Sequence, residues 1–182
     1  MNKALLIATA WCLSFWMAPA YQHAEKEEKG PPVAHDMSLC PANQVHSHLT
    51  ERGEAGMGFS QSTTAHHFII QATGGIIQVE ATNPEDSANR DSIRHHLVHI
   101  AQAFGKGDFD IPMFVHDAIP AGVPELKRLR ANITYSFEQT PAGGQVVIRT
   151  SDPQSLSAVH KFLRYQIQEH QTGDPVTLTP KN

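Results

Sequence analysis

The chain has 182 residues, 40% of them hydrophobic, and its 18 acidic against 14 basic side chains give a formal net charge of −4. This acidic balance, without a clustered basic stripe that could neutralise phosphates, argues against a nucleic-acid partner. The chain also holds 12 histidines and only 2 cysteines.

Residues 1–20 have the features of a secretory signal peptide. Lys3 supplies a short basic start, Ala4–Met17 is apolar, and Ala18-Pro19-Ala20 is a small-residue cleavage site; cleavage after Ala24 is the alternative. The apolar run is short for a membrane span, and no second one follows. We therefore expect a secreted or periplasmic protein with no integral membrane segment after cleavage, whose 13 basic and 18 acidic residues leave a charge of −5.

Residues 21–62 predict a flexible N-terminal arm followed by a Gly-rich loop. The charged and proline-rich EKEEKGPP segment is typical of a solvated linker, and residues 53–58 contain three glycines. Cys40 is the one cysteine left after cleavage, so it is a free thiol, a soft metal ligand or an intermolecular partner. Other donors that suit a soft metal lie in the arm: His23, His35, Met37, His46 and His48.

Residues 63–107 predict a first ββα unit, which begins with a hairpin. Two β-rich runs, His67–Ala72 and Ile76–Thr82, are joined across Thr73-Gly74-Gly75. Alternation places four apolar side chains on the core face of this hairpin: Phe68, Ile70, Ile77 and Val79.

A helix is expected over Glu85–Phe104, started by the N-cap and proline of Asn83-Pro84 and stopped by Gly105 and Gly107. At 100° per residue its apolar positions fall within about 60° of one another, as in a helix that lies on a core. These positions are Ile93, Leu97, Ile100 and Phe104.

Residues 108–131 predict a crossover with a short helix, and residues 132–174 a second ββα unit. In the crossover we expect Asp108–Asp117 to be extended and Pro124–Arg130 to be helical. The second unit has strands Ile133–Gln139 and Gln145–Thr150, a helix capped by Asp152-Pro153 and an end at Thr172-Gly173-Asp174; residues 175–182 form a C-terminal tail.

The two units share their spacing. The separation between Gly74-Gly75 and Gly143-Gly144 equals the separation between Asn83-Pro84 and Asp152-Pro153. Such self-similarity predicts a tandem repeat. We expect an α+β fold in which a tandem ββα repeat forms a four-stranded antiparallel sheet with two helices packed on one face, residues 63–174 making a single domain.

Three histidines on the first predicted helix indicate a metal site. His95 and His99, at i and i+4, lie over one patch of helix surface, close enough to share an ion. His96 lies between that patch and the apolar stripe. When the helices are aligned on their Gly-Asp ends, Gly107-Asp108 and Gly173-Asp174, the second unit holds no histidine at these positions, which predicts that the first unit carries the site and the second supports it. The residues there are Lys161, Phe162 and Tyr165.

Three further histidines are expected near the same end of the first unit. His66 and His67 open the first strand, and an extended crossover could return His116 to that end. Three or four imidazoles suffice for a copper or zinc ion. The predicted metal site thus comprises His95, His99, His96, His66, His67 and His116.

Four functions follow from these observations. The first is a metal-binding protein for copper or zinc, acting in sequestration, delivery or tolerance. The second is a module that binds a protein partner or forms a homodimer, with histidines that are incidental or sense pH. The third is a His-ligated metallohydrolase, for which no H-E-x-x-H motif is present. The fourth is a small-molecule binder with an apolar cleft between the helices.

Overall fold

The structure is a computed structural model, and it describes residues 51–178. All of these residues belong to one compact unit. The predicted signal peptide, Cys40 and the four arm histidines lie outside the described residues.

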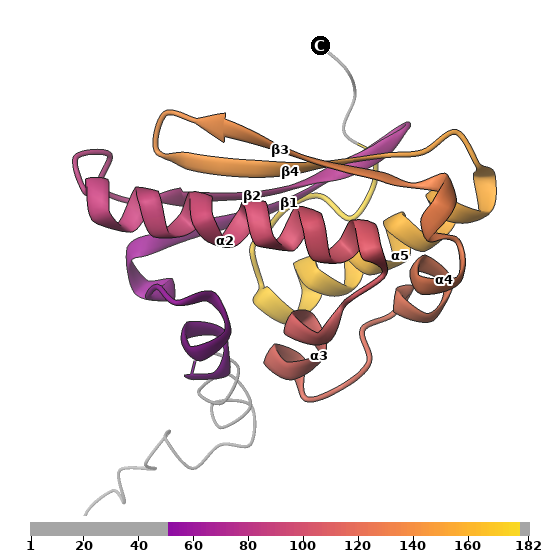
Figure 1. The fold of residues 1–182 in the computed structure, drawn as a ribbon, viewed down its shortest axis with the longest axis horizontal. Helices are drawn as coiled ribbons and strands as arrows, with labels where there is room; N and C mark the ends of the chain where they lie inside the picture. Colours follow the sequence, from indigo (N-terminus) through magenta and orange to yellow (C-terminus); the bar gives the residue numbers. More distant parts are fainter. Residues whose placement is uncertain (1–50, 179–182) are drawn as a thin grey trace, which may run out of the picture. The chain divides into compact units, whose positions relative to one another are not determined.

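Four strands form one antiparallel sheet (Figure 1). The first hairpin pairs β1 (Thr64–Gln71) with β2 (Gly74–Ala81), and the second pairs β3 (Thr134–Thr140) with β4 (Gly143–Arg149). The strand order is β1-β2-β4-β3, so the hairpins join through their second strands. Both hairpins are confirmed, with ends that lie close to the predicted ends.

Equivalent positions of the two hairpins pair in the same way. Phe68 pairs with Ile77 in the first hairpin, and Phe137 pairs with Val146 at the equivalent positions of the second. Ile77 and Val146 in turn face each other across β2 and β4.

Glycine is required where β2 and β4 meet. A Cβ atom on Gly74 would run into the backbone of Ile148, and one on Gly143 into the backbone of Val79. Gly74 also has φ = 146°, a conformation that residues with side chains rarely adopt. The glycines that begin β2 and β4 therefore allow the close approach of the two hairpins.

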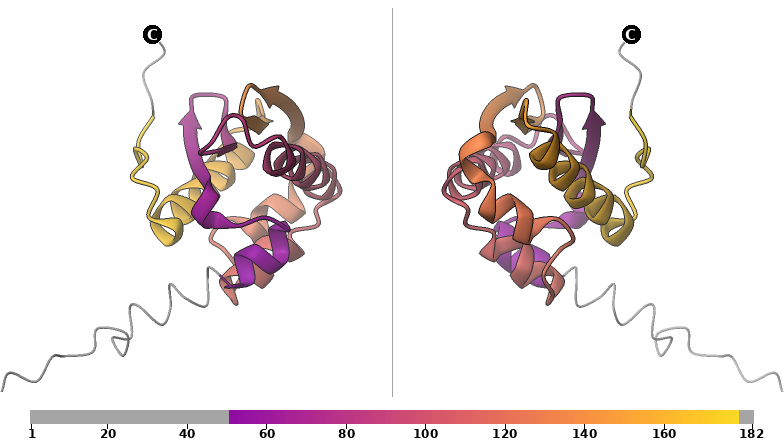
Figure 2. Two further views of the ribbon diagram at one scale, coloured as in Figure 1. Left: turned by 90° about the vertical axis from the view of Figure 1, so that its left-hand side faces the viewer. Right: turned by 90° about the vertical axis from the view of Figure 1, so that its right-hand side faces the viewer.

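Two long helices, α2 (Ser87–Lys106) and α5 (Pro153–His170), cover one face of the sheet (Figures 1 and 2). Helix α2 packs mainly on β3 and β4, whereas α5 packs on β1 and β2. The predicted apolar stripe of α2 is buried. From α5 the core receives Val159, Phe162, Leu163 and Ile167.

Helix α2 begins later than predicted. Its N-cap is Asp86, whose Oδ1 accepts a hydrogen bond of 3.0 Å from the Asn89 N–H. The Asn83 side chain instead accepts from the Glu85 N–H at 3.1 Å, and such a local Asx turn competes with helix capping. The cap of α5 is as predicted, because Asp152 Oδ2 accepts from the Ser155 N–H at 2.8 Å.

Two further predictions were wrong. Most of the segment expected to be extended forms α3 (Asp110–His116), since Asp110 favours a helix N-terminus and a proline is tolerated in the first turn. Residues 51–57, expected to be a loop, are helical and lie against α3, because the atoms nearest to a Cβ on Gly56 belong to Val115, Phe114 and Ile111.

The remaining elements are short. Helix α4 (Val123–Arg128) confirms the predicted short helix, and its Leu126 is buried. Two 3-10 turns, η2 (Gln61–Thr63) and η3 (Arg130–Asn132), precede β1 and β3. Within residues 51–178, no helix has both the length and the apolar character needed to cross a membrane.

Candidate functional site

A cavity of about 70 Å³ lies between the sheet and the helices, and its lining holds four histidines. Each comes from a different element: His66 from β1, His96 from α2, His116 from α3 and His170 from α5. Local periodicity explains two of these orientations. His66 shares a strand face with the core residues Phe68 and Ile70, and His170 continues the buried stripe of α5.

The four imidazoles form a connected aromatic cluster. The His66 and His170 rings are stacked with centroids 6.1 Å apart, and His116 meets His170 edge-on at 5.0 Å. Phe59 stacks on His66 at 6.2 Å and meets His96 edge-on at 5.5 Å. One thioether joins the cluster, since Met57 Sδ lies 3.4 Å from His66 Nε2.

One cavity histidine has a defined tautomer and an unused nitrogen. His116 Nε2 lies 3.0 Å from Gln166 Oε1, and because a carboxamide oxygen only accepts, Nε2 carries the hydrogen. Among the described residues, His116 Nδ1 and Gln166 Nε2 are buried atoms without a hydrogen-bond partner. Metal-ligating histidines commonly donate their other ring N–H to a carbonyl oxygen in this way.

Burial keeps the cavity histidines neutral. Desolvation, with a smaller effect from neighbouring imidazoles, lowers the pKa of His66 and of His96 to about 4 and the pKa of His170 to about 3. Desolvation also lowers the pKa of His116, against the opposing effect of the Gln166 hydrogen bond. Neutral imidazole is the form that binds metal ions.

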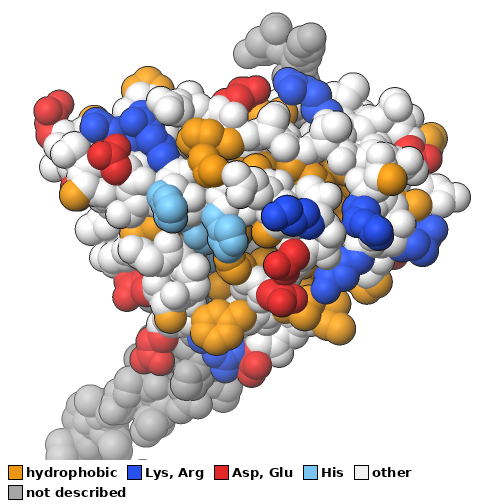
Figure 3. All heavy atoms as spheres, viewed as in Figure 1, with side chains coloured by type: hydrophobic (Ala, Val, Ile, Leu, Met, Phe, Trp, Pro, Cys, Tyr) orange, Lys and Arg blue, Asp and Glu red, His pale blue; other side chains and the backbone are white. Residues whose placement is uncertain are grey.

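The other predicted site residues do not line the cavity. His95 and His99 are exposed on α2, and histidine side chains lie at the surface on the face of the molecule that Figure 3 shows. His67 Nδ1 lies 3.0 Å from Asp174 Oδ1, and Asp174 Oδ2 accepts from the Phe68 N–H at 2.8 Å. His67 thus helps to tie the C-terminal segment to the edge strand β1.

Sequence reasoning missed Met57, Gln166 and His170. A signal for the last two was present, because the alignment of the helices on their Gly-Asp ends matches them with Ile100 and Phe104 of the apolar stripe. Polar residues aligned with that stripe stand out when the comparison starts from it. Since α5 supplies Gln166 and His170, the cavity is lined by both long helices rather than by α2 alone.

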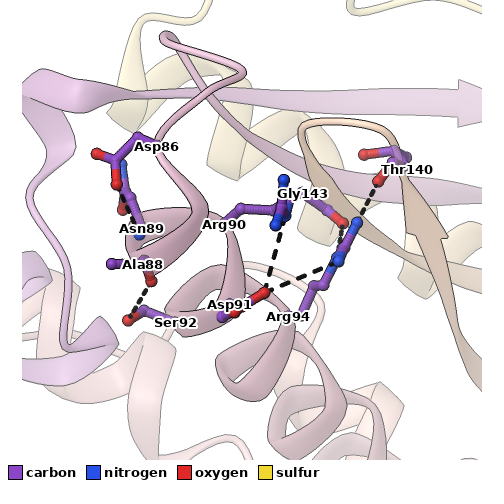
Figure 4. Close-up of polar contacts among 9 residues, drawn as sticks. All are labelled: Asp86, Ala88, Asn89, Arg90, Asp91, Ser92, Arg94, Thr140 and Gly143. Atoms are coloured by element: carbon purple, nitrogen blue, oxygen red, sulfur yellow. Dashed lines mark hydrogen bonds and ion pairs between the residues drawn. The ribbon is translucent and has the colours of Figure 1, made fainter.

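Hydrogen bonds fix the helices that carry these histidines. Arg94 Nε donates to Gly143 O at 2.9 Å, and its Nη2 donates to Thr140 O at 2.8 Å, beside the β3–β4 turn (Figure 4). On α5, His160 Nε2 donates to Gln71 O at 2.9 Å, beside the β1–β2 turn. Arg94 thus anchors α2 to the turn end of the second hairpin, and His160 anchors α5 to the turn end of the first.

The cavity as it stands offers neutral nitrogen and sulfur donors. Among residues 51–178, no group of three or more His, Cys, Asp or Glu side chains is arranged so that it could hold a metal ion, so the imidazoles would have to turn toward a common point. The described residues that line the cavity carry no side-chain carboxylate, hydroxyl or thiol group. Comparisons with protein-family models, curated proteins and solved structures found no match to this chain.

Proposed function

We propose that this chain binds a copper or zinc ion in the histidine cavity and serves metal sequestration, delivery or tolerance as a secreted or periplasmic protein. The observation that carries the proposal is the presence of four neutral imidazoles, from four separate elements, in the described lining of one small cavity. Imidazole nitrogen and thioether sulfur are donors that suit these metals.

The proposal includes a tandem ββα repeat, with the two halves as copies. The equivalent pairings of Phe68 and Phe137 support this relation. So do two bonds between the hairpins, from the Ala81 N–H to Ala142 O and from the Thr150 N–H to Thr73 O, whose donors and acceptors occupy equivalent positions of the two halves.

We align the hairpins on their glycine pairs and the helices on their Gly-Asp ends. Phe or Tyr then stands in the other half at the positions of three cavity histidines. His66 corresponds to Tyr135, His96 to Phe162 and His170 to Phe104. Phe104 and Tyr135 pack edge-on at 5.7 Å, and His170 and His66, at the equivalent positions, stack at 6.1 Å. The scaffold therefore tolerates phenyl groups at these positions, and packing alone does not account for the imidazoles.

Two polar atoms at the cavity make no hydrogen bond to the described residues, His116 Nδ1 and Gln166 Nε2. A bound ion with its water, or water alone, would give these atoms a partner.

The test is a titration of the purified, untagged protein with Cu and Zn salts, followed by elemental analysis. The double variant His66→Tyr/His170→Phe, taken from the equivalent positions of the other half, removes cavity nitrogen while keeping aromatic bulk. His95→Ala/His99→Ala is the matched surface control, and circular dichroism checks that each variant folds. We expect one ion per chain in the wild type and the control, and none in the cavity variant.

Other outcomes contradict this proposal. Loss of the ion only in His95→Ala/His99→Ala would place the site on the surface of α2, and absence of binding in the wild type would remove the metal function. The remaining candidate is then a partner-binding or dimerising module, for which Phe114 and Ile119, with 53% and 65% of their surface exposed, are available contact residues. Light scattering coupled to size exclusion would measure such association.

A further inference from the structure

The Met57 thioether gives the cavity a feature that distinguishes between metals. Met57 Sδ and His66 Nε2 are 3.4 Å apart. With metal–nitrogen bonds of about 2.0 Å and metal–sulfur bonds of about 2.3 Å, two ligands of one tetrahedral ion are separated by about 3.5 Å. These two donor atoms therefore already have the separation that a shared ion requires.

The backbone around Gly58 places the thioether. The helical segment 51–57 ends at Gly58, whose N–H donates a hydrogen bond of 2.9 Å to Glu54 O. Gly58 itself has φ = 78°. This turn directs Met57 and Phe59, on either side of it, toward the same imidazole of His66. The glycine-rich segment thus supplies both a sulfur donor and an aromatic cover.

The charge of the cavity favours a monovalent ion. Apart from its histidines, the described lining contains no ionisable side chain. No carboxylate is therefore present among these lining residues to compensate a divalent cation. The free energy of moving an ion into an apolar medium grows with the square of its charge, so the penalty for a monovalent ion is about fourfold smaller. Thioether ligands also select Cu(I).

Building on the proposed metal function, we infer that the cavity is selective for Cu(I), with Met57 Sδ and His66 Nε2 as two of its ligands. His96 or His170 supplies a third ligand, since His170 stacks on His66 and His96 contacts Phe59, which also stacks on His66. Gln166 holds His116, whose ring meets His170 edge-on, as a further donor.

The experiment measures Cu(I) affinity by anaerobic competition with bicinchoninate, and Zn(II) affinity by competition with a chromophoric chelator. Met57→Leu removes the sulfur at nearly constant volume. Met113→Leu is the matched control, because Met113 Sδ contacts Lys127 Nζ at 3.8 Å and is absent from the cavity lining. We expect Met57→Leu to weaken Cu(I) binding about tenfold or more, corresponding to about 1.4 kcal/mol, to weaken Zn(II) binding less, and to leave the Met113→Leu control at the wild-type affinity.

X-ray absorption at the copper edge gives a second readout that does not depend on affinity. The wild type should show a sulfur neighbour at about 2.3 Å, and Met57→Leu should lack it. Tight Zn(II) binding without Cu(I) preference, or a copper site with no sulfur neighbour, would overturn this inference and leave the proposed function intact. Failure to bind either ion would remove both.

Discussion

At the scale of single residues, the cavity histidines weaken the metal-free fold in acid. Their pKa values in the folded protein, about 4 for His66 and His96 and about 3 for His170, lie below the ordinary value of about 6.5. The unfolded chain therefore takes up protons first as the pH falls. The stability that these groups contribute is complete above about pH 6.5 and declines from there toward pH 4.

The free energy of unfolding of the metal-free protein should accordingly fall as the pH decreases from 6.5 to 4. Each histidine adds up to about 1.4 kcal/mol per pH unit to this slope. Replacing His170 by Phe, which keeps the aromatic bulk, should reduce the slope by about that amount. Urea unfolding at several pH values measures it, and identical slopes in the wild type and His170→Phe would show that His170 is not held neutral.

At the scale of elements, the two hairpins depend on glycine where their second strands meet. A Cβ on Gly143 would run into the backbone of Val79, whereas a Cβ on Gly105 of α2 would meet no atom within 4 Å. Backbone cannot move aside as a flexible side chain can. The two glycines therefore predict opposite effects of the same substitution.

Gly143→Ala should destabilise the protein by roughly 2 kcal/mol or more, because β2 and β4 must separate locally. Gly105→Ala should be neutral or stabilise it by up to about 1 kcal/mol, since alanine has the higher helix propensity. Urea unfolding measures both values. Equal destabilisation in the two variants would contradict the observed packing of the central strands.

Local sequence signals predicted the long elements and the short helix α4, but they failed on α3 and on residues 51–57. The strands and the long helices carry clear periods of 2 and 3.6, so the sheet and the stripe of α2 could be predicted. Helix α3 could not, because its seven residues include a proline and β-branched side chains, and its packing against residues 51–57 is not visible in local sequence. Nor does local sequence show that the Asn83 side chain accepts from Glu85 in a local turn, so that Asp86 becomes the N-cap of α2.

At the scale of the whole molecule, the cavity arises from long-range packing. His66, His96 and His116 were predicted to lie together, and they line one cavity. The i, i+4 pair of His95 and His99 carried no information on which face of α2 is buried, and that pair is exposed. His170 reaches the cavity because α5 crosses β1, an arrangement that only the strand order and helix placement determine.

The most direct test of the central claim is an NMR titration that follows histidine ring nitrogens while Zn(II) or Cu(I), both diamagnetic, is added to the isotope-labelled protein. The cavity-binding account predicts large shifts, complete at one equivalent, for the ring nitrogens of His66 and of at least two of His96, His116 and His170, with His95, His99 and His67 unchanged. Shifts confined to His95 and His99, or no saturable shift in any cavity histidine, would contradict it.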